Sequence, residues 1–288
     1  MSFGGWMSSG GGPDAACVLG RSRACREFRA QRAAGRIERA AYRNRSHLGV
    51  LETGTRMAMT APQAGRIYSQ WDKVHQRCGS RYGHMMADAV YHGMPTNTSA
   101  RVLMLGLGGG VIGADMLCRD ARGHGGARIR QLVAIELEPQ VVSLAMERFF
   151  PVMFSGVCAG ARERMRVVVG DALAAASLVR QRPSFHAIAV DVPPVYDAPE
   201  TAPDVFWRSL GSLTAPGALL VANTIYTRPH DARTLQARLE RAGWAPLPSI
   251  IAGPGSWRPR ANVLVLARRA AGAARDHYAT FTPRRGSH

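Results

Sequence analysis

The chain has 288 residues, 46% of them hydrophobic, which is enough for one large domain with a small extension. No apolar run reaches the roughly 20 residues that a membrane-spanning helix needs, so a helical membrane protein is excluded. The formal net charge is +17, but Lys73 is the only lysine among the 37 basic residues, a bias typical of GC-rich coding and not of a selected nucleic-acid-binding face.

Residues 1–46 begin with a Gly/Ser-rich stretch and continue as an Arg/Ala segment with few large apolar side chains. This composition predicts a flexible basic arm. Two roles for the arm stay open. It could contact a nucleic acid or another polyanion. It could also target the protein to an organelle, although Glu27 and Glu38 are untypical of a transit peptide.

The cysteines are odd in number and scattered, and none of them forms a C-x-x-C pair. We therefore expect ordinary thiols in a reducing, cytoplasmic compartment. The same spacing predicts neither a disulfide framework nor a bound metal. The five are Cys17, Cys25, Cys78, Cys118 and Cys158.

Residues 47–98 predict a small N-terminal β lobe followed by a connecting helix. Segments 49–55 and 56–60 indicate two short strands with a turn between them, and 66–70 indicates a third piece that could pair with them. A helix is expected over 82–91, and Pro95 ends this region.

Residues 99–269 predict one α/β domain, because strand and helix patterns alternate. Parallel strands with helices on both faces are expected for the first part of the domain, and an antiparallel pair for its last two strands. The tail at 270–288 is polar and without periodicity, so it is expected to be disordered. The predicted strands lie at 102–105, 130–136, 165–169, 185–190, 219–223, 249–251 and 263–266.

A glycine cluster follows the first strand of this domain and precedes a helix. Gly106, Gly108 and Gly110 let the backbone turn sharply and approach a ligand without interference from a Cβ atom. The helix that starts near Val111 points free N–H groups over the turn. This arrangement favours a nucleotide or nucleoside cofactor.

Acidic residues follow the next three strands, at the edge of the sheet where ligands of open α/β folds bind. Glu136 would accept hydrogen bonds from two ribose hydroxyls, whereas Glu138 beside Pro139 is the alternative that favours a helix N-terminus. Asp171, after Gly170, either caps a helix or contacts an adenine amine. Asp191 follows the fourth strand.

Two classes of cofactor fit a glycine turn followed by an acid. Residues 108–113 formally match the dinucleotide pattern G-x-G-x-x-G, so a nicotinamide-dependent oxidoreductase is one alternative. Counted from Gly106, however, the third glycine should stand at Val111. The acids after the third and fourth strands have no role in dinucleotide binding, and they suit a nucleoside that carries an amino-acid tail.

Residues 101–268 resemble a class I S-adenosylmethionine-dependent transferase, specifically one of the spermidine-synthase-like group of polyamine aminopropyltransferases. The resemblance implies a Rossmann-like, seven-stranded methyltransferase-type sheet after a small antiparallel β lobe. It also implies Glu136 on the ribose, Asp171 at the adenine and Asp191 facing the acceptor, with no metal. The motifs that carry it are the G-x-G-G-G turn, Ile135-Glu136-Leu137-Glu138-Pro139, Val169-Gly170-Asp171-Ala172, Ala189-Val190-Asp191, Pro216–Asn223 and, more weakly, Tyr82-Gly83-His84-Met85.

The chain departs from polyamine synthases at positions that concern the donor. Gly109 stands where they carry an acid, and the second acid of their Asp-x-x-Asp motif is Pro194 here, so Asp197 is a candidate substitute. Gly83 and His84 replace a Gln and a Glu. These departures favour methyl transfer from S-adenosylmethionine, with aminopropyl transfer from decarboxylated S-adenosylmethionine as the alternative.

The stretch between Arg182 and Arg208 contains no Lys or Arg but several acids. In so basic a chain this favours a small amine as the acceptor, because a positively charged protein would otherwise repel it. Asp191 and Asp197 would then be catalytic. A non-catalytic binding module stays open as a different class of function, and so does a homodimer.

Overall fold

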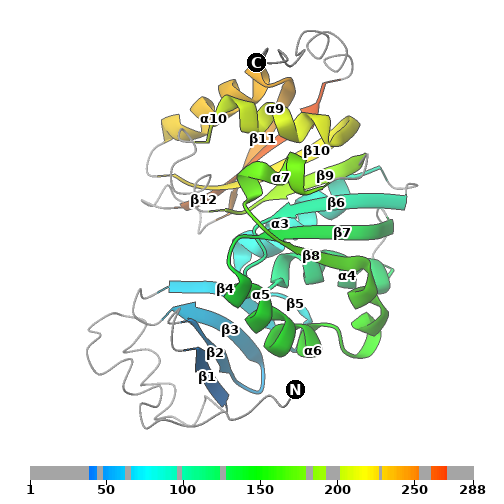
Figure 1. Cartoon of the computed structure of the whole chain (residues 1–288), viewed down its shortest axis with the longest axis vertical. Coiled ribbons are helices and arrows are strands. Elements are labelled where there is room, and N and C mark those ends of the chain that lie inside the picture. The colour runs from blue at the N-terminus through cyan, green and yellow to red at the C-terminus, as the bar shows by residue number, and fades with distance from the viewer. Residues whose placement is uncertain are drawn as a thin grey trace, which may run out of the picture.

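The computed structural model has a small sheet and a larger α/β unit. In Figure 1 the small sheet lies below the larger unit. The residues that it describes are 39–43, 48–61, 66–95, 99–123, 128–179, 184–192, 202–226, 229–252 and 261–270.

The small sheet is antiparallel throughout, with its strands paired in the order β1-β2-β3-β4-β5. Met57, Met59 and Trp71 are fully buried on one of its faces. The predicted lobe therefore exists, with two more strands than the sequence indicated. The strands are β1 (Arg39–Arg43), β2 (Leu48–Glu52), β3 (Arg56–Ala61), β4 (Arg66–Asp72) and β5 (Arg77–Cys78).

Strand β1 corrects the boundary of the predicted arm. Residues 39–43 were expected to be flexible as part of 1–46, yet they pair with β2 from Arg39↔Glu52 to Arg43↔Leu48. Pairing of this kind uses backbone N–H and C=O groups, so it does not need the large apolar side chains that the segment lacks. The rest of the arm lies outside the described residues, and so does the predicted tail apart from Ala270.

The large sheet has seven strands in the order β11-β12-β10-β9-β6-β7-β8. Strands β8, β7, β6, β9 and β10 are parallel, whereas β12 is antiparallel to both β10 and β11. This confirms the predicted seven-stranded α/β sheet with its antiparallel close. The strands are β6 (Ser99–Leu105), β7 (Arg128–Glu136), β8 (Met165–Val169), β9 (Phe185–Val190), β10 (Thr214–Tyr226), β11 (Trp244–Ala252) and β12 (Ala261–Arg269).

Helices cover both faces of the large sheet, as the alternation of its side chains requires. Along β6, Val102 and Met104 face one apolar cluster, and Leu103 and Leu105 face another. The first face carries α3 (Arg81–Gly93), α4 (Val111–Ala121), α5 (Pro139–Leu144), η2 (Ala145–Phe149), α6 (Phe150–Met153) and η3 (Gly156–Arg164). The second carries η4 (Ala172–Ala174), α7 (Ala175–Leu178), α9 (Asp204–Ser212) and α10 (Pro229–Arg241). Within the described residues no helix is long and apolar enough to cross a membrane.

The small sheet shares its core with the first face of the large unit. Trp71 and Met59 belong to the same buried cluster as Phe149 and Ile112. The two sheets are therefore joined by a continuous apolar core. This packing brings β4 next to the glycine turn.

Two cysteines are paired, contrary to the expectation of ordinary thiols. Cys118 on α4 and Cys158 on η3 form a disulfide, with 5.2 Å between their Cα atoms. They are 40 residues apart in sequence and meet because α4 packs against η3. Cys78 is free and buried, and burial raises the pKa of its thiol to about 12.

Candidate functional site

The glycine turn between β6 and α4 has a backbone that only glycine adopts readily. Gly106, Gly108 and Gly110 have φ angles of +87°, +52° and +76°. A Cβ atom at Gly106 would overlap the carbonyl oxygen of Asp191. Hydrogen bonds from Gly106 N to Ile135 O and from Asp191 N to Leu105 O, both 2.8 Å, hold the three strand ends together.

Glu136, at the end of β7, reaches back to this turn. Its Oε2 accepts hydrogen bonds from the backbone N–H groups of Leu107 at 2.9 Å and Gly108 at 3.2 Å, and its Oε1 accepts one from Glu138 N at 3.2 Å. A carboxylate offers about four acceptor positions, so about one stays available in this arrangement. Glu136 is partly exposed, whereas Glu138 is exposed and makes no side-chain cap on α5.

Asp191, just after β9, is held from two sides. Asn223 donates from Nδ2 to Oδ1 at 2.8 Å, and the Tyr82 hydroxyl donates to Oδ2 at 3.3 Å. Burial raises the pKa of the Asp191 carboxyl, and the nearby charge of Glu136 adds to this rise, while the two hydrogen bonds oppose it. The carboxylate is thus fixed in orientation and a better proton acceptor than an ordinary aspartate.

The side-chain amide of Asn262 fixes the orientation of the Asn223 amide. Asn262 donates from Nδ2 to Oδ1 of Asn223 at 2.9 Å, so the amide nitrogen of Asn223 must face Asp191. Asn223 is buried, with 2% of its surface exposed. The chain Asn262–Asn223–Asp191–Tyr82 therefore joins β12, β10, the end of β9 and α3 at one edge of the sheet.

Asp171 caps a short helix in the structure. Its Oδ1 accepts a hydrogen bond from Leu173 N at 2.9 Å, at the start of η4. A Cβ atom at Gly170 would lie 2.6 Å from Leu178 Cδ1, so a larger residue here would require the Leu178 side chain to move. The capping role is therefore present, and the adenine contact stays a prediction. Asp197 lies outside the described residues.

Ser69 on β4 is a residue of the site that sequence reasoning missed. Its Oγ is buried and accepts a hydrogen bond from Gly109 N at 2.7 Å. Forty positions separate the two residues, and no local pattern marks the serine. Asn223 could have been found, because it is a polar residue that follows the apolar run of 218–222, at the sheet edge where the acids lie.

Gly83 and His84 contact residues other than Asp191 and its hydrogen-bond partners. A Cβ atom at Gly83 would lie 2.5 Å from Cys78 Sγ, so a larger side chain does not fit there. His84 Nδ1 lies 2.9 Å from Oδ2 of Asp115, a buried acid that also pairs with Arg119. Among the described residues, no group of three or more His, Cys, Asp or Glu side chains is arranged to hold a metal ion.

Comparison with known proteins identifies the fold. No protein-family model matches the chain, and no curated protein sequence does. Among solved structures, spermidine synthase from Thermotoga maritima is similar with a TM-score of 0.56 and 12% identity, over 82% of this chain and 73% of that chain. A spermidine synthase in complex with the transition-state analogue AdoDATO has a TM-score of 0.55 and the same identity and coverage. The chain has the class I S-adenosylmethionine-dependent transferase fold.

Proposed function

We propose that the protein is a methyltransferase that uses S-adenosylmethionine and acts on a small amine. The donor would lie over Gly106, Gly108 and Gly110, with a ribose hydroxyl on Glu136. The amine would lie against Asp191. The observation that carries the choice of donor is the packing around Gly109.

Gly109 has no room for the acid that polyamine synthases have in their glycine turn. A Cβ atom there would lie 2.9 Å from Ser69 Cβ and 3.2 Å from Phe149 Cδ1. The backbone N–H of Gly109 is also engaged by Ser69. A carboxylate at this position, which would bind the propylamine of the decarboxylated donor, would therefore require Ser69 or Phe149 to move. Intact S-adenosylmethionine brings its own carboxylate and does not need one there.

The residues at the strand ends fit the needs of such a transfer. The sulfonium of the bound donor supplies an electrophilic methyl carbon. In such a transfer the acceptor nitrogen would form the new N–C bond as the C–S bond breaks, and the sulfur would keep the electron pair. Asp191 would hold the amine in line and take its proton, with Tyr82 and Asn223 fixing the carboxylate.

An adenosyl thioether should stabilise the protein. S-adenosylhomocysteine or methylthioadenosine at a hundredfold excess over its dissociation constant should raise the free energy of unfolding by about 2.7 kcal/mol, because it binds only the folded state. Thermal-shift measurements with these two ligands and NAD provide the check. A shift with NAD alone would contradict the proposal and favour an oxidoreductase.

The intact donor should bind at least as well as the decarboxylated one. A charge-assisted hydrogen bond to the propylamine is worth about 1.5–3 kcal/mol, so a site without the acid forgoes about ten- to a hundredfold in affinity for the decarboxylated form. Calorimetric titration of the wild type with both donors measures this. A tenfold preference for the decarboxylated donor that disappears in Asp191→Asn would instead identify a polyamine synthase.

Gly109→Asp should destabilise the protein and should not create affinity for the decarboxylated donor. Overpacking against Ser69 and Phe149 should cost about 1–3 kcal/mol of unfolding free energy, measured by urea denaturation. Gly109→Ala is the matched control, because it adds the Cβ atom without the charge. An aspartate variant as stable as the wild type would show that the space is there after all.

A further inference from the structure

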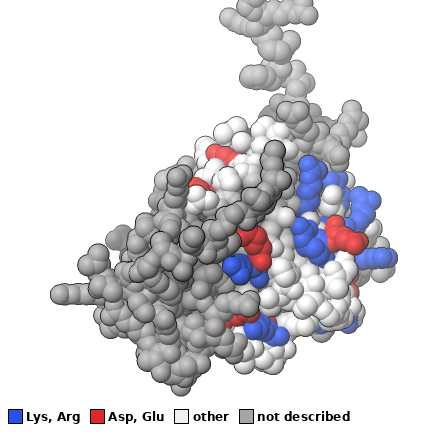
Figure 2. All heavy atoms as spheres, turned by 60° about the horizontal axis from the view of Figure 1, so that its bottom comes forward, with Lys and Arg blue, Asp and Glu red and all other residues white. Residues whose placement is uncertain are grey.

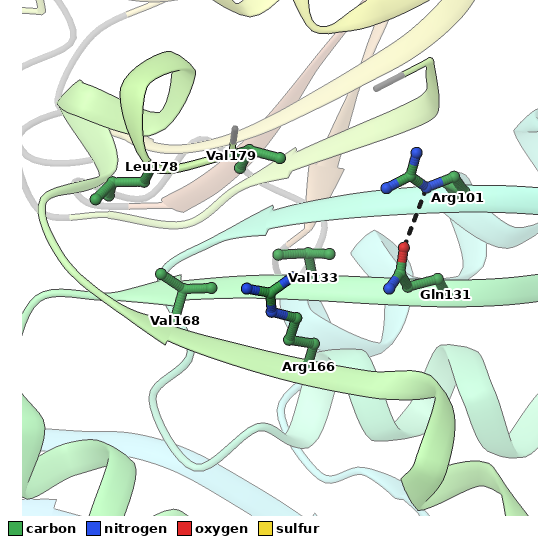
Figure 3. A pocket seen from close by; sticks show the side chains of 7 residues that line it. All are labelled: Arg101, Gln131, Val133, Arg166, Val168, Leu178 and Val179. Atoms are coloured by element: carbon green, nitrogen blue, oxygen red, sulfur yellow. Dashed lines mark hydrogen bonds between the residues drawn. The ribbon is translucent and has the colours of Figure 1, made fainter. Parts of the chain in front are cut away.

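A hollow of about 160 Å³ lies on the second face of the large sheet, between β7, β8 and the end of α7. Figure 3 shows its lining, with the guanidinium of Arg101 nearer the starts of the strands and that of Arg166 reaching toward Val133 and Val168. The lining residues are Arg101, Gln131, Val133, Arg166, Val168, Leu178 and Val179.

The hollow lies away from the glycine turn. Arg101 is near the start of β6, four residues before the strand ends at Leu105, and Arg166 is near the start of β8. A second, wider hollow of about 540 Å³ adjoins it and is also lined by Arg101, Gln131 and Arg166. This wider hollow continues the first one toward the starts of the strands.

Positive charge dominates this edge of the sheet. Figure 2 shows basic side chains, with acidic ones among them, gathered at the right of the molecule, the side on which Figure 1 places the starts of β6, β7 and β8. Among the described residues, Arg130 and Arg166 have no acidic partner, whereas the neighbouring Arg164 pairs with Asp120. Of the described residues that line the wider hollow, Glu163 is the one acid.

Burial and this positive charge together lower the pKa values of two half-buried side chains, Arg101 and His186. Arg101 is half-buried, with its Nε 3.1 Å from Gln131 Oε1 and its guanidinium 5.1 Å from the Phe185 ring centroid. Burial lowers the pKa of Arg101, and the like charge of Arg130 lowers it further. Burial also lowers the pKa of His186, and Arg130 and Arg101 add to this effect. An anion placed beside Arg101 would offset its repulsion with Arg130.

We propose that this pocket binds a small aromatic carboxylate. The ring would pack against Val133, Val168 and Val179, and the carboxylate would pair with Arg101 and Arg166. The size agrees, because an apolar cavity of about 150 Å³ is enough to hold benzene. A pocket that combines apolar side chains with two arginines suits an anion with an apolar part. The phosphates of a nucleic acid need no such apolar contact. The site is independent of the transfer chemistry at the opposite edge of the sheet.

The test is methyl-resolved NMR of the full chain with benzoate as the probe. Benzoate should shift the methyl signals of the valines and Leu178 that line the pocket in a saturable way. Benzamide, which has the ring without the charge, and inorganic phosphate, which has the charge without the ring, should each bind at least about tenfold more weakly, because each lacks one of the two contacts.

Variants separate the pocket from general charge effects. The double variant Arg101→Gln/Arg166→Gln should weaken benzoate binding by about tenfold or more, since it removes the charge-assisted pairs. Arg208→Gln on α9 removes a charge elsewhere and should leave binding unchanged. Val179→Phe should block the pocket with both arginines intact.

Three outcomes would overturn the proposal. The first is the absence of methyl shifts with benzoate. The second is equal weakening by Arg208→Gln, which would indicate attraction by net charge alone. The third is a short DNA duplex that shifts the same signals in a strongly salt-dependent way while benzoate does not, which would assign the edge to a polyanion.

Discussion

Replacing Asp191 by asparagine is expected to slow methyl transfer by about a hundred- to ten-thousandfold, the usual contribution of a positioned general base. Asparagine keeps the shape and can still accept the hydrogen bond from Asn223, but it takes no proton. The wild-type rate should fall as the pH is lowered. The pKa of this fall should lie above that of an ordinary aspartate, because burial raises the pKa of the Asp191 carboxyl. Initial rates with an amine panel across pH give both results.

The same variant should be more stable than the wild type at neutral pH. A carboxyl whose pKa is raised on folding contributes stability that is fully present below its unfolded pKa and is lost as the pH rises through the folded pKa. Asparagine has no charged form and avoids the loss. The gain in unfolding free energy should therefore be largest near pH 7 and shrink as the pH falls toward about 4, the ordinary aspartate value.

Asp204→Asn is the matched control. Asp204 lies on α9, with carboxylate oxygens 3.8 Å from nitrogens of Arg238 and Arg241, and none of these residues hydrogen-bonds to Asp191. This control should keep the wild-type rate and show no such gain in stability. An Asp191→Asn variant that retains full activity, or that is less stable than the wild type at pH 7, would remove Asp191 from the proposed role.

Replacing Glu136 by glutamine is expected to weaken S-adenosylhomocysteine binding by about ten- to a hundredfold, because hydrogen bonds to a charged group are worth about 1.5–3 kcal/mol. Glutamine has one acceptor oxygen where glutamate has two. With this oxygen on the Leu107 and Gly108 N–H groups, the amide nitrogen would face the Glu138 N–H and could accept neither from it nor from a ribose hydroxyl. Calorimetric titration measures the loss.

Glu138→Gln is the matched control for this experiment. Glu138 is two residues away and exposed, and its side chain makes no cap on α5. Its replacement should change the affinity by less than about twofold, in keeping with the small effect of an exposed charge. A larger loss with Glu138→Gln than with Glu136→Gln would transfer the ribose contact to Glu138, the alternative that the sequence left open.

The sequence by itself determined the architecture of the large unit. Unbroken apolar runs alternating with helical patterns predict buried parallel strands, and the acids after them predict which edge holds the site, because the carboxyl ends of parallel strands meet at one edge. The turn at Gly106, Gly108 and Gly110 is also a local property, since positive φ angles favour glycine. Glu136 and Asp191 reach that edge for the same reason.

Only the tertiary structure decided which groups these residues contact. Ser69 accepts from Gly109, Tyr82 donates to Asp191, and Asn262 orients Asn223. These contacts join segments that lie tens of residues apart, and a hydrogen bond between distant segments leaves no periodicity in the chain.

The same limit explains two differences between the sequence-based expectations and the structure. Strand β1 is held by backbone pairing with β2, and Cys118 meets Cys158 through the packing of α4 on η3. Hydrophobic patterning records which face of a segment is buried, but not which segment buries it. Partners of this kind are set only once the chain is folded.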